Sequence, residues 1–310
     1  MKRFLVSRLS ALGDVVCTLP VAVALKQSYP DSHITWAVDP RFAGVVESCA
    51  AADEIVRVKP GLHPSSWTKL PGEFDVALDM QGLFKSGVIV GKSQAARKLG
   101  YHWQREGAWL FSSRVMPDST SLHVVDQYVD VARAAGAQMD RAEFGLSPQP
   151  QDVVSAREKL GPVTGPLVIV NPGAGWVTKR WPTAHFAALI DALSVEGCVC
   201  VLIGGKAESD LEVAREVSTQ CRQEPRSLVG QTSVGELIGL ISLANAHVGG
   251  DTGSTHIAAA LGKPAVGLYS ITRPERSCPY GQIERCHYDP TSLSNIEPNA
   301  VVKTVLEALA

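Results

Sequence analysis

Ala246-His-Val-Gly-Gly-Asp-Thr-Gly-Ser-Thr-His-Ile-Ala-Ala-Ala-Leu-Gly-Lys-Pro-Ala-Val-Gly-Leu-Tyr269 joins two short apolar runs through a helical pattern of small residues. The runs Ala246–Gly249 and Ala265–Tyr269 predict buried strands, and a helix is predicted to begin between them at Asp251 or Thr252. A strand, a helix and a strand in this order indicate parallel pairing through a right-handed crossover. The segment therefore predicts an α/β fold.

The same alternation extends along the rest of the chain. Further predicted strands are Phe4–Ser7, Ile34–Val38, Ile55–Val58, Val76–Asp79, Leu167–Asn171, Val199–Ile203 and Ser227–Val229. Predicted helices are Val15–Ser28, His123–Ala135, Thr183–Val195, Ser209–Gln220 and Val234–Leu243. The proline-containing stretch Leu146-Ser-Pro-Gln-Pro-Gln151 separates two such series and has the composition of a linker. We therefore predict two doubly wound parallel-sheet domains, which bind ligands outside the carboxyl ends of their strands.

The composition excludes several classes of protein. Of 310 residues, 45% are apolar and 19% are charged, which is typical of a folded globular chain and not of a disordered one. The net charge of −2 argues against a protein that holds nucleic acid by bulk charge. The most apolar stretch, Leu5 to Leu25, is interrupted by Arg8, Asp14 and Pro20, so we expect a buried first strand there, neither a spanning helix nor a signal peptide.

The seven cysteines favour a reducing compartment, because their number is odd and they are scattered. Cys198 and Cys200 form a C-x-C pair within an apolar run. We predict that both pack in the core, because no second Cys or His pair completes a tetrahedral metal site. The sequence thus predicts a cytoplasmic protein without a metal site.

The first chemical motif is Arg8-Leu-Ser-Ala-Leu-Gly-Asp14, which directly follows the first predicted strand. It lacks the G-x-G-x-x-G spacing of a dinucleotide-binding turn. Asp14 has two possible roles: it caps the following helix, or it acts as a catalytic base at the end of a strand that faces a cleft.

The second motif is Asn171-Pro-Gly-Ala-Gly-Trp-Val-Thr-Lys-Arg-Trp-Pro182, between a strand and a helix. It is not a Walker A loop. Its two glycines, Thr178, Lys179 and Arg180 suit an anionic ligand, although an ordinary solvated loop would also carry such residues.

The third motif is Gly249-Gly-Asp-Thr-Gly-Ser-Thr-His256, at the start of the helix described first. Exposed backbone N–H groups at a helix start bind phosphate, and Gly253 in the first turn permits close approach of a ligand. We expect Asp251 to accept sugar hydroxyls or to cap the helix. His256 lies one turn beyond Thr252 and on the same face.

A basic stretch runs from Met80 to Arg105 and contains no acidic residue. It suits a phosphorylated or carboxylated acceptor, although a solvated basic surface would look the same. The chain contains no D-x-D pair, which many metal-dependent sugar transferases use to hold a diphosphate. We therefore expect lysine, arginine and helix N–H groups to neutralise the leaving group.

Together these motifs resemble the heptosyltransferases of lipopolysaccharide biosynthesis, glycosyltransferase family 9. The resemblance covers nearly the whole chain. Besides the motifs above it includes Thr18-Leu-Pro20, Asp79-x-Gln-Gly-Leu-x-Lys-Ser86 and Ala258-Ala-Ala-Leu-Gly-x-Pro264. Trp103-x-Arg-Glu-Gly-Ala108 and His123-x-x-Asp126 look more like the first heptosyltransferase of the pathway than the second. Where the family often reads Gly-Pro-Thr, this chain has Leu268-Tyr-Ser-Ile-Thr272.

The resemblance implies a GT-B fold, with two Rossmann-like domains facing a central cleft. The first, residues 1–148, would bind acceptor, and the second, residues 149–297, would bind the nucleotide sugar, while a C-terminal helix at 298–310 packs back onto the first. It implies an inverting, metal-independent glycosyltransferase without a cofactor, with ADP-heptose as co-substrate and Asp14 as catalytic base. The implied donor-binding residues are Thr178, Lys179, Arg180, Glu208, Thr232, Asp251, Thr252, Gly253 and His256.

The implied acceptor is Kdo–lipid A at the inner face of the cytoplasmic membrane, which the protein would contact peripherally. The acceptor-binding candidates are Arg8, Lys85, Arg105, Arg114 and His123. Three alternatives stay open: transfer to heptosyl-Kdo–lipid A, a nucleotide-sugar epimerase or hydrolase on the same scaffold, and a non-catalytic nucleotide-sugar-binding module.

Overall fold

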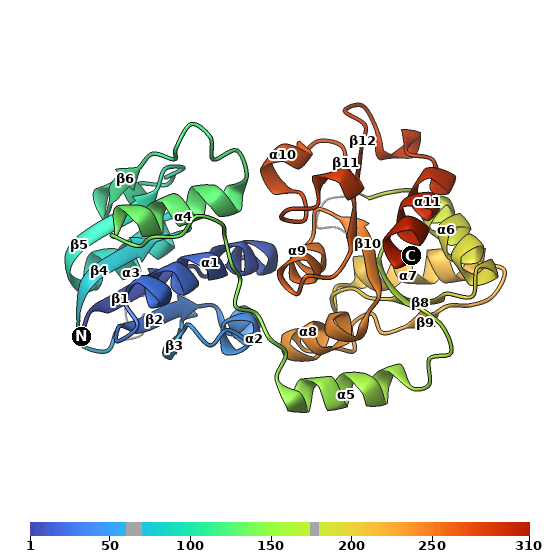
Figure 1. Ribbon diagram of the computed structural model, residues 1–310, viewed down its shortest axis with the longest axis horizontal. Coiled ribbons are helices and arrows are strands. Elements are labelled where there is room, and N and C mark those ends of the chain that lie inside the picture. Colours follow the sequence, from blue (N-terminus) through green and yellow to red (C-terminus); the bar gives the residue numbers. More distant parts are fainter. Residues whose placement is uncertain (60–69, 174–179) are drawn as a thin grey trace. The chain divides into compact units, whose positions relative to one another are not determined.

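The computed structural model describes residues 1–59, 70–173 and 180–310 of the chain. The chain divides into two compact units, Met1–Ser147 and Pro148–Ala310 (Figure 1). No helix among the described residues is long and apolar enough to cross a membrane.

The first unit is built on a parallel sheet with the strand order β3-β2-β1-β4-β5-β6. Its strands are β1 Arg3–Ser7, β2 His33–Val38, β3 Glu54–Arg57, β4 Glu73–Asp79, β5 Gln94–Tyr101 and β6 Ser113–Val115. Its helices are α1 Leu12–Ser28, α2 Ala43–Glu47, α3 Phe84–Lys92 and α4 Val124–Ala134. The direction of strand addition reverses between β1 and β4, where Ser7 pairs with Asp79. Ligands of doubly wound sheets bind beyond the strand ends at this switch point.

The second unit repeats the topology with the order β12-β11-β10-β7-β8-β9. Its strands are β7 Leu167–Asn171, β8 Val199–Leu202, β9 Arg226–Ser227, β10 Ala246–Gly250, β11 Ala265–Tyr269 and β12 Cys286–Tyr288. Its helices are α5 Pro150–Leu160, α6 Thr183–Val195, α7 Glu208–Gln220, α8 Val234–Leu243, α9 Gly253–Ala260, α10 Pro274–Ser277 and α11 Pro298–Leu309. The switch point lies between β7 and β10, where Asn171 pairs with Gly249.

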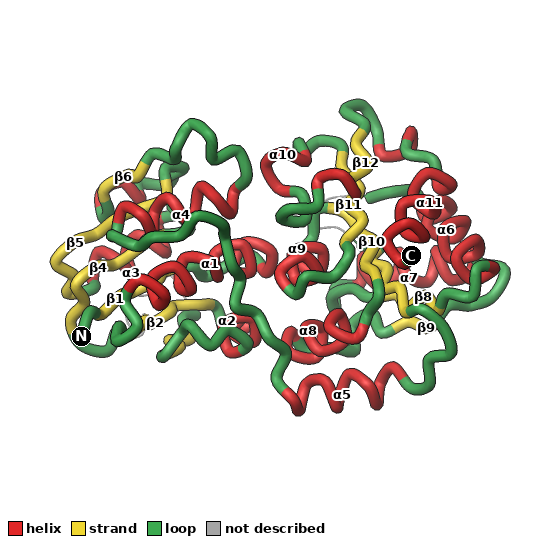
Figure 2. Tube along the Cα trace, in the orientation of Figure 1, coloured by secondary structure: helices red, strands yellow, loops and turns green. Residues whose placement is uncertain are grey.

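The core of the second unit lies where its strands meet the helix layers. Helices α8 and α9 lie on one side of the sheet, and α6 and α11 lie on the other (Figure 2). All five residues of β7, β10 and β11 are buried, as expected for strands covered on both faces. Cys198 and Cys200 are free thiols that pack in this core, as predicted.

The C-terminal helix α11 belongs to the second unit and packs in its core. Its Val301 and Val305 are fully buried in the core of the second unit, and the helix packs against α6. Trp181 adds to this attachment, because its indole Nε1 donates a 2.9 Å hydrogen bond to the carbonyl oxygen of Ile296, just before the helix. The apolar stripe of α11 is therefore used within the second unit.

Several elements were not predicted from the sequence. Strand β5 lies within the basic stretch, and its first six residues are exposed or half-buried without a regular alternation. Helix α5 begins at Pro150, inside the expected linker, because proline is favoured in the first helical turn. Strands β6 and β12 have three residues each, and α3 has two glycines, so their sequence signals are weak.

Candidate functional site

The carboxylate of Asp14 lies near the switch point of the first sheet. It is the third residue of α1, its side chain is 47% exposed, and its Oδ1 is 2.7 Å from Nη2 of Arg8. Its Oδ2 accepts a 3.2 Å hydrogen bond from the N–H of Ala11, the residue before the helix. Asp14 therefore contributes to the helix start and still presents its carboxylate to solvent, so the two roles considered from the sequence are compatible.

Arg8 approaches Asp14 from inside the unit. Its side chain is only 5% exposed, its Nη1 donates to the carbonyl oxygen of Met80, and its guanidinium lies 5.2 Å from the ring centroid of Tyr128. A buried guanidinium requires a counter-charge and hydrogen-bond acceptors, and Asp14 and the end of β4 supply them. Arg8, a predicted acceptor ligand, contacts Asp14 in this structure.

The motif that begins at Asp79 shapes the loop beside this ion pair. Asp79 Oδ1 accepts hydrogen bonds from the N–H groups of Gln81 (3.1 Å) and Gly82 (3.0 Å), and burial raises the pKa of this carboxyl. The Gln81 side chain accepts from the N–H of Leu9 (3.0 Å) and donates to Oγ of Ser10 (3.2 Å). The two motifs at the ends of β1 and β4 are thus joined by hydrogen bonds.

Gly82 is required at its position for two reasons. Its φ is +67°, and a Cβ there would lie 2.5 Å from the carbonyl oxygen of Trp103. The Gly82 carbonyl oxygen also accepts a 2.7 Å hydrogen bond from the N–H of Arg105. The loops after β4 and β5 therefore meet at Gly82, which places Arg105 at the same edge of the sheet as Asp14.

In the second unit, a polar network surrounds the start of α9. Nδ2 of Asn171 donates to Oγ of Ser254 (2.8 Å) and to Oγ1 of Thr252 (3.3 Å). Thr252 precedes α9, and its Oγ1 is also 3.2 Å from Oγ1 of Thr255. Oγ of Ser254 lies 3.0 Å from Nε2 of His247, a fully buried side chain whose pKa burial lowers to about 3. The network therefore rests on a neutral histidine, and it holds the first turn of α9 against the end of β7.

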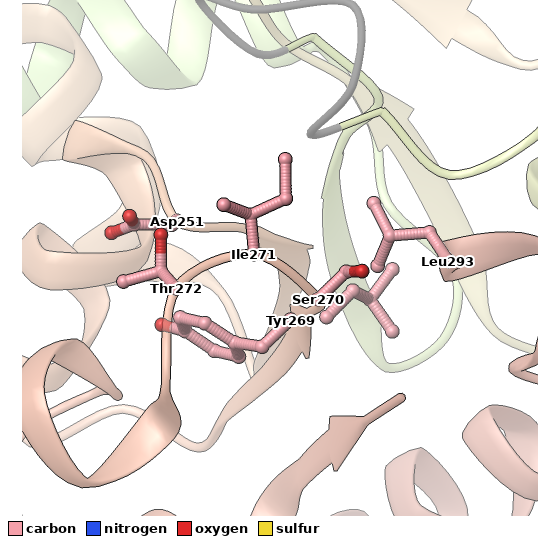
Figure 3. Close-up of a pocket in the computed structure, with 7 residues that line it drawn as sticks. Asp251, Tyr269, Ser270, Ile271, Thr272 and Leu293 are labelled. Atoms are coloured by element: carbon pink, nitrogen blue, oxygen red, sulfur yellow. The ribbon is translucent and has the colours of Figure 1, made fainter. Parts of the chain in front are cut away.

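Asp251 and His256 flank this helix start. Oδ1 of Asp251 lies 3.5 Å from Nε2 of His256, and both side chains are mostly buried. Asp251 also lines a small pocket with the segment 268–272 and with Leu293 (Figure 3). Thr272 contributes a hydroxyl to the same pocket, so the stretch that departs from the family pattern lies beside Asp251.

The remaining donor-side candidates differ in how the structure presents them. Thr178 and Lys179 lie outside the described residues, whereas the neighbouring Arg180 is half-buried. Glu208 begins α7 and is exposed, with its Oε1 3.1 Å from Nη1 of Arg215. Thr232 is half-buried, two residues before α8.

The remaining acceptor-side candidates belong to the first unit. Lys85 is half-buried in the first turn of α3, and it adds to the electrostatic lowering of the pKa of Asp39, which is caused mainly by hydrogen bonds from Arg41. Arg114 is exposed on β6. His123 is buried before α4, and its Nδ1 accepts a 3.2 Å hydrogen bond from the N–H of Val125, so this ring nitrogen serves the helix start.

Some residues of these sites were not singled out from the sequence. Ser254 is a small residue, and His247 lies within an apolar strand. The contact between them exists only after β10 and α9 pack together. Asp210 is another: its Oδ2 accepts a 2.9 Å hydrogen bond from the N–H of Gly205, and its Oδ1 would lie 3.1 Å from a Cβ at Gly173. The only sequence signal for Asp210 is an acidic residue in the first turn of a helix after a glycine pair.

The model of glycosyltransferase family 9 (heptosyltransferase) matches residues 65–295. This chain belongs to that family. Among the similar relatives, the lipopolysaccharide core heptosyltransferase OpsX of Haemophilus influenzae is 27% identical over 289 residues, which cover 91% of this chain and 83% of OpsX. Lipopolysaccharide heptosyltransferase 1 of Escherichia coli K12 is 26% identical over 324 residues, covering 97% and 98% of the two chains.

Solved structures show the same fold. A family 9 glycosyltransferase from Veillonella parvula superposes with a TM-score of 0.86 at 23% identity and covers 99% of this chain and 97% of its own. Heptosyltransferase II of E. coli gives a TM-score of 0.83 at 21% identity, with 100% and 98% covered. The predicted fold class, a GT-B protein with two doubly wound parallel sheets, is therefore confirmed.

Proposed function

We propose that this heptosyltransferase moves a heptose from ADP-L-glycero-β-D-manno-heptose to the Kdo residue of Kdo–lipid A, with inversion at the anomeric carbon. The main support is the half-exposed carboxylate of Asp14, which is held by a buried arginine near the switch point of the first sheet. Inversion needs one base that removes the proton of the attacking hydroxyl, and it needs no covalent partner. The Asp14 carboxylate is accessible, and its position is fixed. Among the described residues, its contacts are with the Arg8 side chain and the N–H of Ala11.

The second unit is proposed to bind the donor. The start of α9 offers backbone N–H groups, the Thr252 hydroxyl and a glycine that lets a phosphate approach. The departing ADP gains negative charge in the transition state, and a helix N-terminus with nearby cations stabilises that charge. Arg180 and Lys179 are proposed to be such cations, and Thr178 is proposed to add a hydroxyl. Asp251 and His256 are proposed to bind the sugar, and Glu208 and Thr232 the adenosine.

Two structures of relatives support this assignment of the donor. The E. coli heptosyltransferase WaaC has been solved with ADP and with ADP-2-deoxy-2-fluoro heptose. Because no D-x-D pair is present in the sequence, we propose that the reaction requires neither a metal ion nor a cofactor and that ADP-heptose is a co-substrate.

The first unit is proposed to bind the acceptor and to attach reversibly to the inner face of the cytoplasmic membrane. Kdo–lipid A carries carboxylates and phosphates, which suit Lys85, Arg105 and Arg114, with His123 nearby in the chain. The same region exposes large apolar side chains that a lipid surface would cover: Phe84, Trp103, Trp109, Leu110, Met116 and Leu122. Cations together with exposed aromatic and aliphatic residues are typical of proteins that lie on anionic membranes.

A transfer assay tests the proposed function directly. The purified protein is incubated with ADP-heptose and either Kdo–lipid A or heptosyl-Kdo–lipid A, with and without EDTA, and the products are analysed by mass spectrometry. We expect addition of one heptose to Kdo–lipid A, and we expect the same amount of product with and without EDTA. Transfer only to heptosyl-Kdo–lipid A would move the enzyme to the next step, whereas free heptose or an epimerised donor would contradict transferase activity. A loss with EDTA that Mg²⁺ or Mn²⁺ restores would contradict metal independence.

A further inference from the structure

We propose that Arg8 is a positioning residue for the reaction: it fixes the Asp14 carboxylate in the direction from which the acceptor hydroxyl arrives. This inference rests on the proposed role of Asp14 as catalytic base. It replaces the expectation that Arg8 binds the acceptor, because a side chain that is 5% exposed offers almost no surface to a substrate.

Two hydrogen bonds to strand β2 hold the backbone of Arg8. Its N–H donates a 3.2 Å hydrogen bond to the carbonyl oxygen of Ala37, and its own carbonyl oxygen accepts a 3.2 Å hydrogen bond from Nε1 of Trp36. Both partners lie on β2, the neighbour of β1, and Trp36 is fully buried. The Cα of Arg8 is therefore fixed to the sheet.

The guanidinium is then fixed by groups from three elements. Nη1 donates to the carbonyl oxygen of Met80 after β4, Nη2 contacts Asp14 on α1, and the planar group lies over the ring of Tyr128 on α4. A guanidinium is planar and rigid, so an anchor on one nitrogen sets the direction of the other. The hydrogen bond to Met80 consequently determines where Nη2 meets the carboxylate.

The charges in this cluster favour a permanent ion pair. Burial alone would lower the pKa of Arg8, but the pKa is raised, because the charge of Asp14 and its hydrogen bond favour the protonated guanidinium. Burial also raises the pKa of Tyr128 well above 10, so its hydroxyl is neutral at physiological pH, and Asp14 is then the counter-charge in contact with Arg8. Removing either partner of such a pair leaves a poorly solvated charge.

The geometry leaves the carboxylate able to react. A carboxylate has about four lone-pair positions, and Asp14 uses one for Arg8 and one for the N–H of Ala11. The two donors bind different oxygens, so they restrict rotation of the group about its own axis. The remaining lone pairs belong to the half-exposed side chain and stay available to a substrate hydroxyl. Small errors in the placement of such a base are costly to the rate.

A double-mutant cycle between Arg8 and Asp14 tests the proposal. Arg8→Met, Asp14→Asn and the double variant are compared in kcat, in the KM of each substrate, in ADP affinity and in melting temperature. We expect Arg8→Met to lower kcat by roughly 10–100-fold while each KM changes less than about threefold. In the Asp14→Asn background, the same substitution should lower kcat by less than about twofold, because its partner is already gone.

Two further variants make the result decisive. Arg8→Lys keeps the charge but lacks the planar guanidinium that reaches Met80 and Asp14 together, so it should recover only part of kcat. It also replaces Arg8→Met in the test if that variant does not fold. Arg57→Met removes an exposed arginine from its ion pair with Glu47 in the same unit, and it should leave kcat unchanged.

Three results would overturn the proposal. A higher acceptor KM with normal kcat would make Arg8 an acceptor ligand. An equal loss of kcat in the Asp14→Asn background would show that Arg8 does not act through Asp14. Full activity of both Arg8 variants would leave it no role in the reaction. Near-normal turnover of Asp14→Asn is a different outcome, because it contradicts Asp14 as the base and hence the proposed function itself.

Discussion

Asn171 and Ser254 are 83 residues apart in the chain, yet Nδ2 of Asn171 donates a 2.8 Å hydrogen bond to Oγ of Ser254. The contact joins the end of β7 to the first turn of α9 across the switch point of the second sheet. It thereby fixes the helix N-terminus that we assign to the donor phosphates.

Asn171→Ala should weaken ADP binding. The substitution removes hydrogen bonds to Ser254 and Thr252 and leaves buried hydroxyls with fewer partners, which costs about 1–3 kcal/mol of folding free energy. We expect ADP affinity, measured by calorimetry, to fall about tenfold. Asn245→Ala is the matched control: its Oδ1 accepts a 2.9 Å hydrogen bond from the N–H of Leu167, at the opposite end of β7. If both variants lose stability and both keep ADP affinity, the network is structural only.

Asp14→Ala should lower kcat by roughly 10²–10⁴-fold and leave ADP affinity nearly unchanged, because general base catalysis is lost while the donor site stays intact. The hydrogen bond to Ala11 is also lost, which should cost about 1 kcal/mol of stability, and the buried Arg8 loses its counter-charge, which should add to that cost. Steady-state kinetics and thermal unfolding separate the two effects. A variant with normal turnover and lowered melting temperature would reduce Asp14 to its role at the helix start.

Lys85→Ala should raise the acceptor KM much more than the donor KM, because Lys85 is assigned to the anionic acceptor. The matched control is Lys92→Ala, which removes the exposed lysine at the other end of the same helix and should change neither KM. The opposite pattern, a higher donor KM with an unchanged acceptor KM, would mean that the two substrates are assigned to the wrong units.

Binding of the protein to vesicles that contain anionic lipid should fall as salt rises from 50 to 500 mM, because the screening length shortens from ~14 Å to ~4 Å. Trp109→Ala, at a side chain that is 56% exposed, should weaken binding further at every salt concentration. Val195→Ala truncates an exposed side chain of the second unit and serves as the control. Equal binding to purely zwitterionic vesicles would argue against attachment through the cations.

The stability of the protein should depend on pH through His247. In the unfolded chain a histidine has a pKa near 6.5, whereas in the folded protein the pKa of His247 is about 3. Between these values the unfolded state binds more protons, so stability is lost as pH falls from about 6.5 toward 3, by at most about 1.4 kcal/mol per pH unit. The free energy of unfolding, measured with denaturant at several pH values, should change less steeply with pH for His247→Gln than for the wild type. His33→Gln is the control, since the His33 side chain is 30% exposed; an unchanged slope in His247→Gln would refute the assignment.

The fold class could be predicted from the sequence, because strands covered on both faces must be continuously apolar. Helices α6 and α8 begin and end where their patterns predict, at Thr183–Val195 and Val234–Leu243. Parallel pairing of the strands follows from the helices between them, because a strand–helix–strand connection is almost always a right-handed crossover between parallel strands. Each chemical motif was also recognisable as a polar or glycine-rich stretch at the end of an apolar strand.

Which polar residues meet could not be predicted from the sequence, because it depends on how distant elements pack together. Strand β5 has exposed polar positions that carry no periodic apolar signal, so it becomes a strand only by pairing with β4. The apolar stripe of helix α11 does not by itself identify its partner, and in the structure α11 packs against α6. For Arg8, the residue type predicts a surface cation. Its burial between Met80, Tyr128 and Asp14 arises from contacts between elements far apart in the chain, and burial is what makes it a partner of the base.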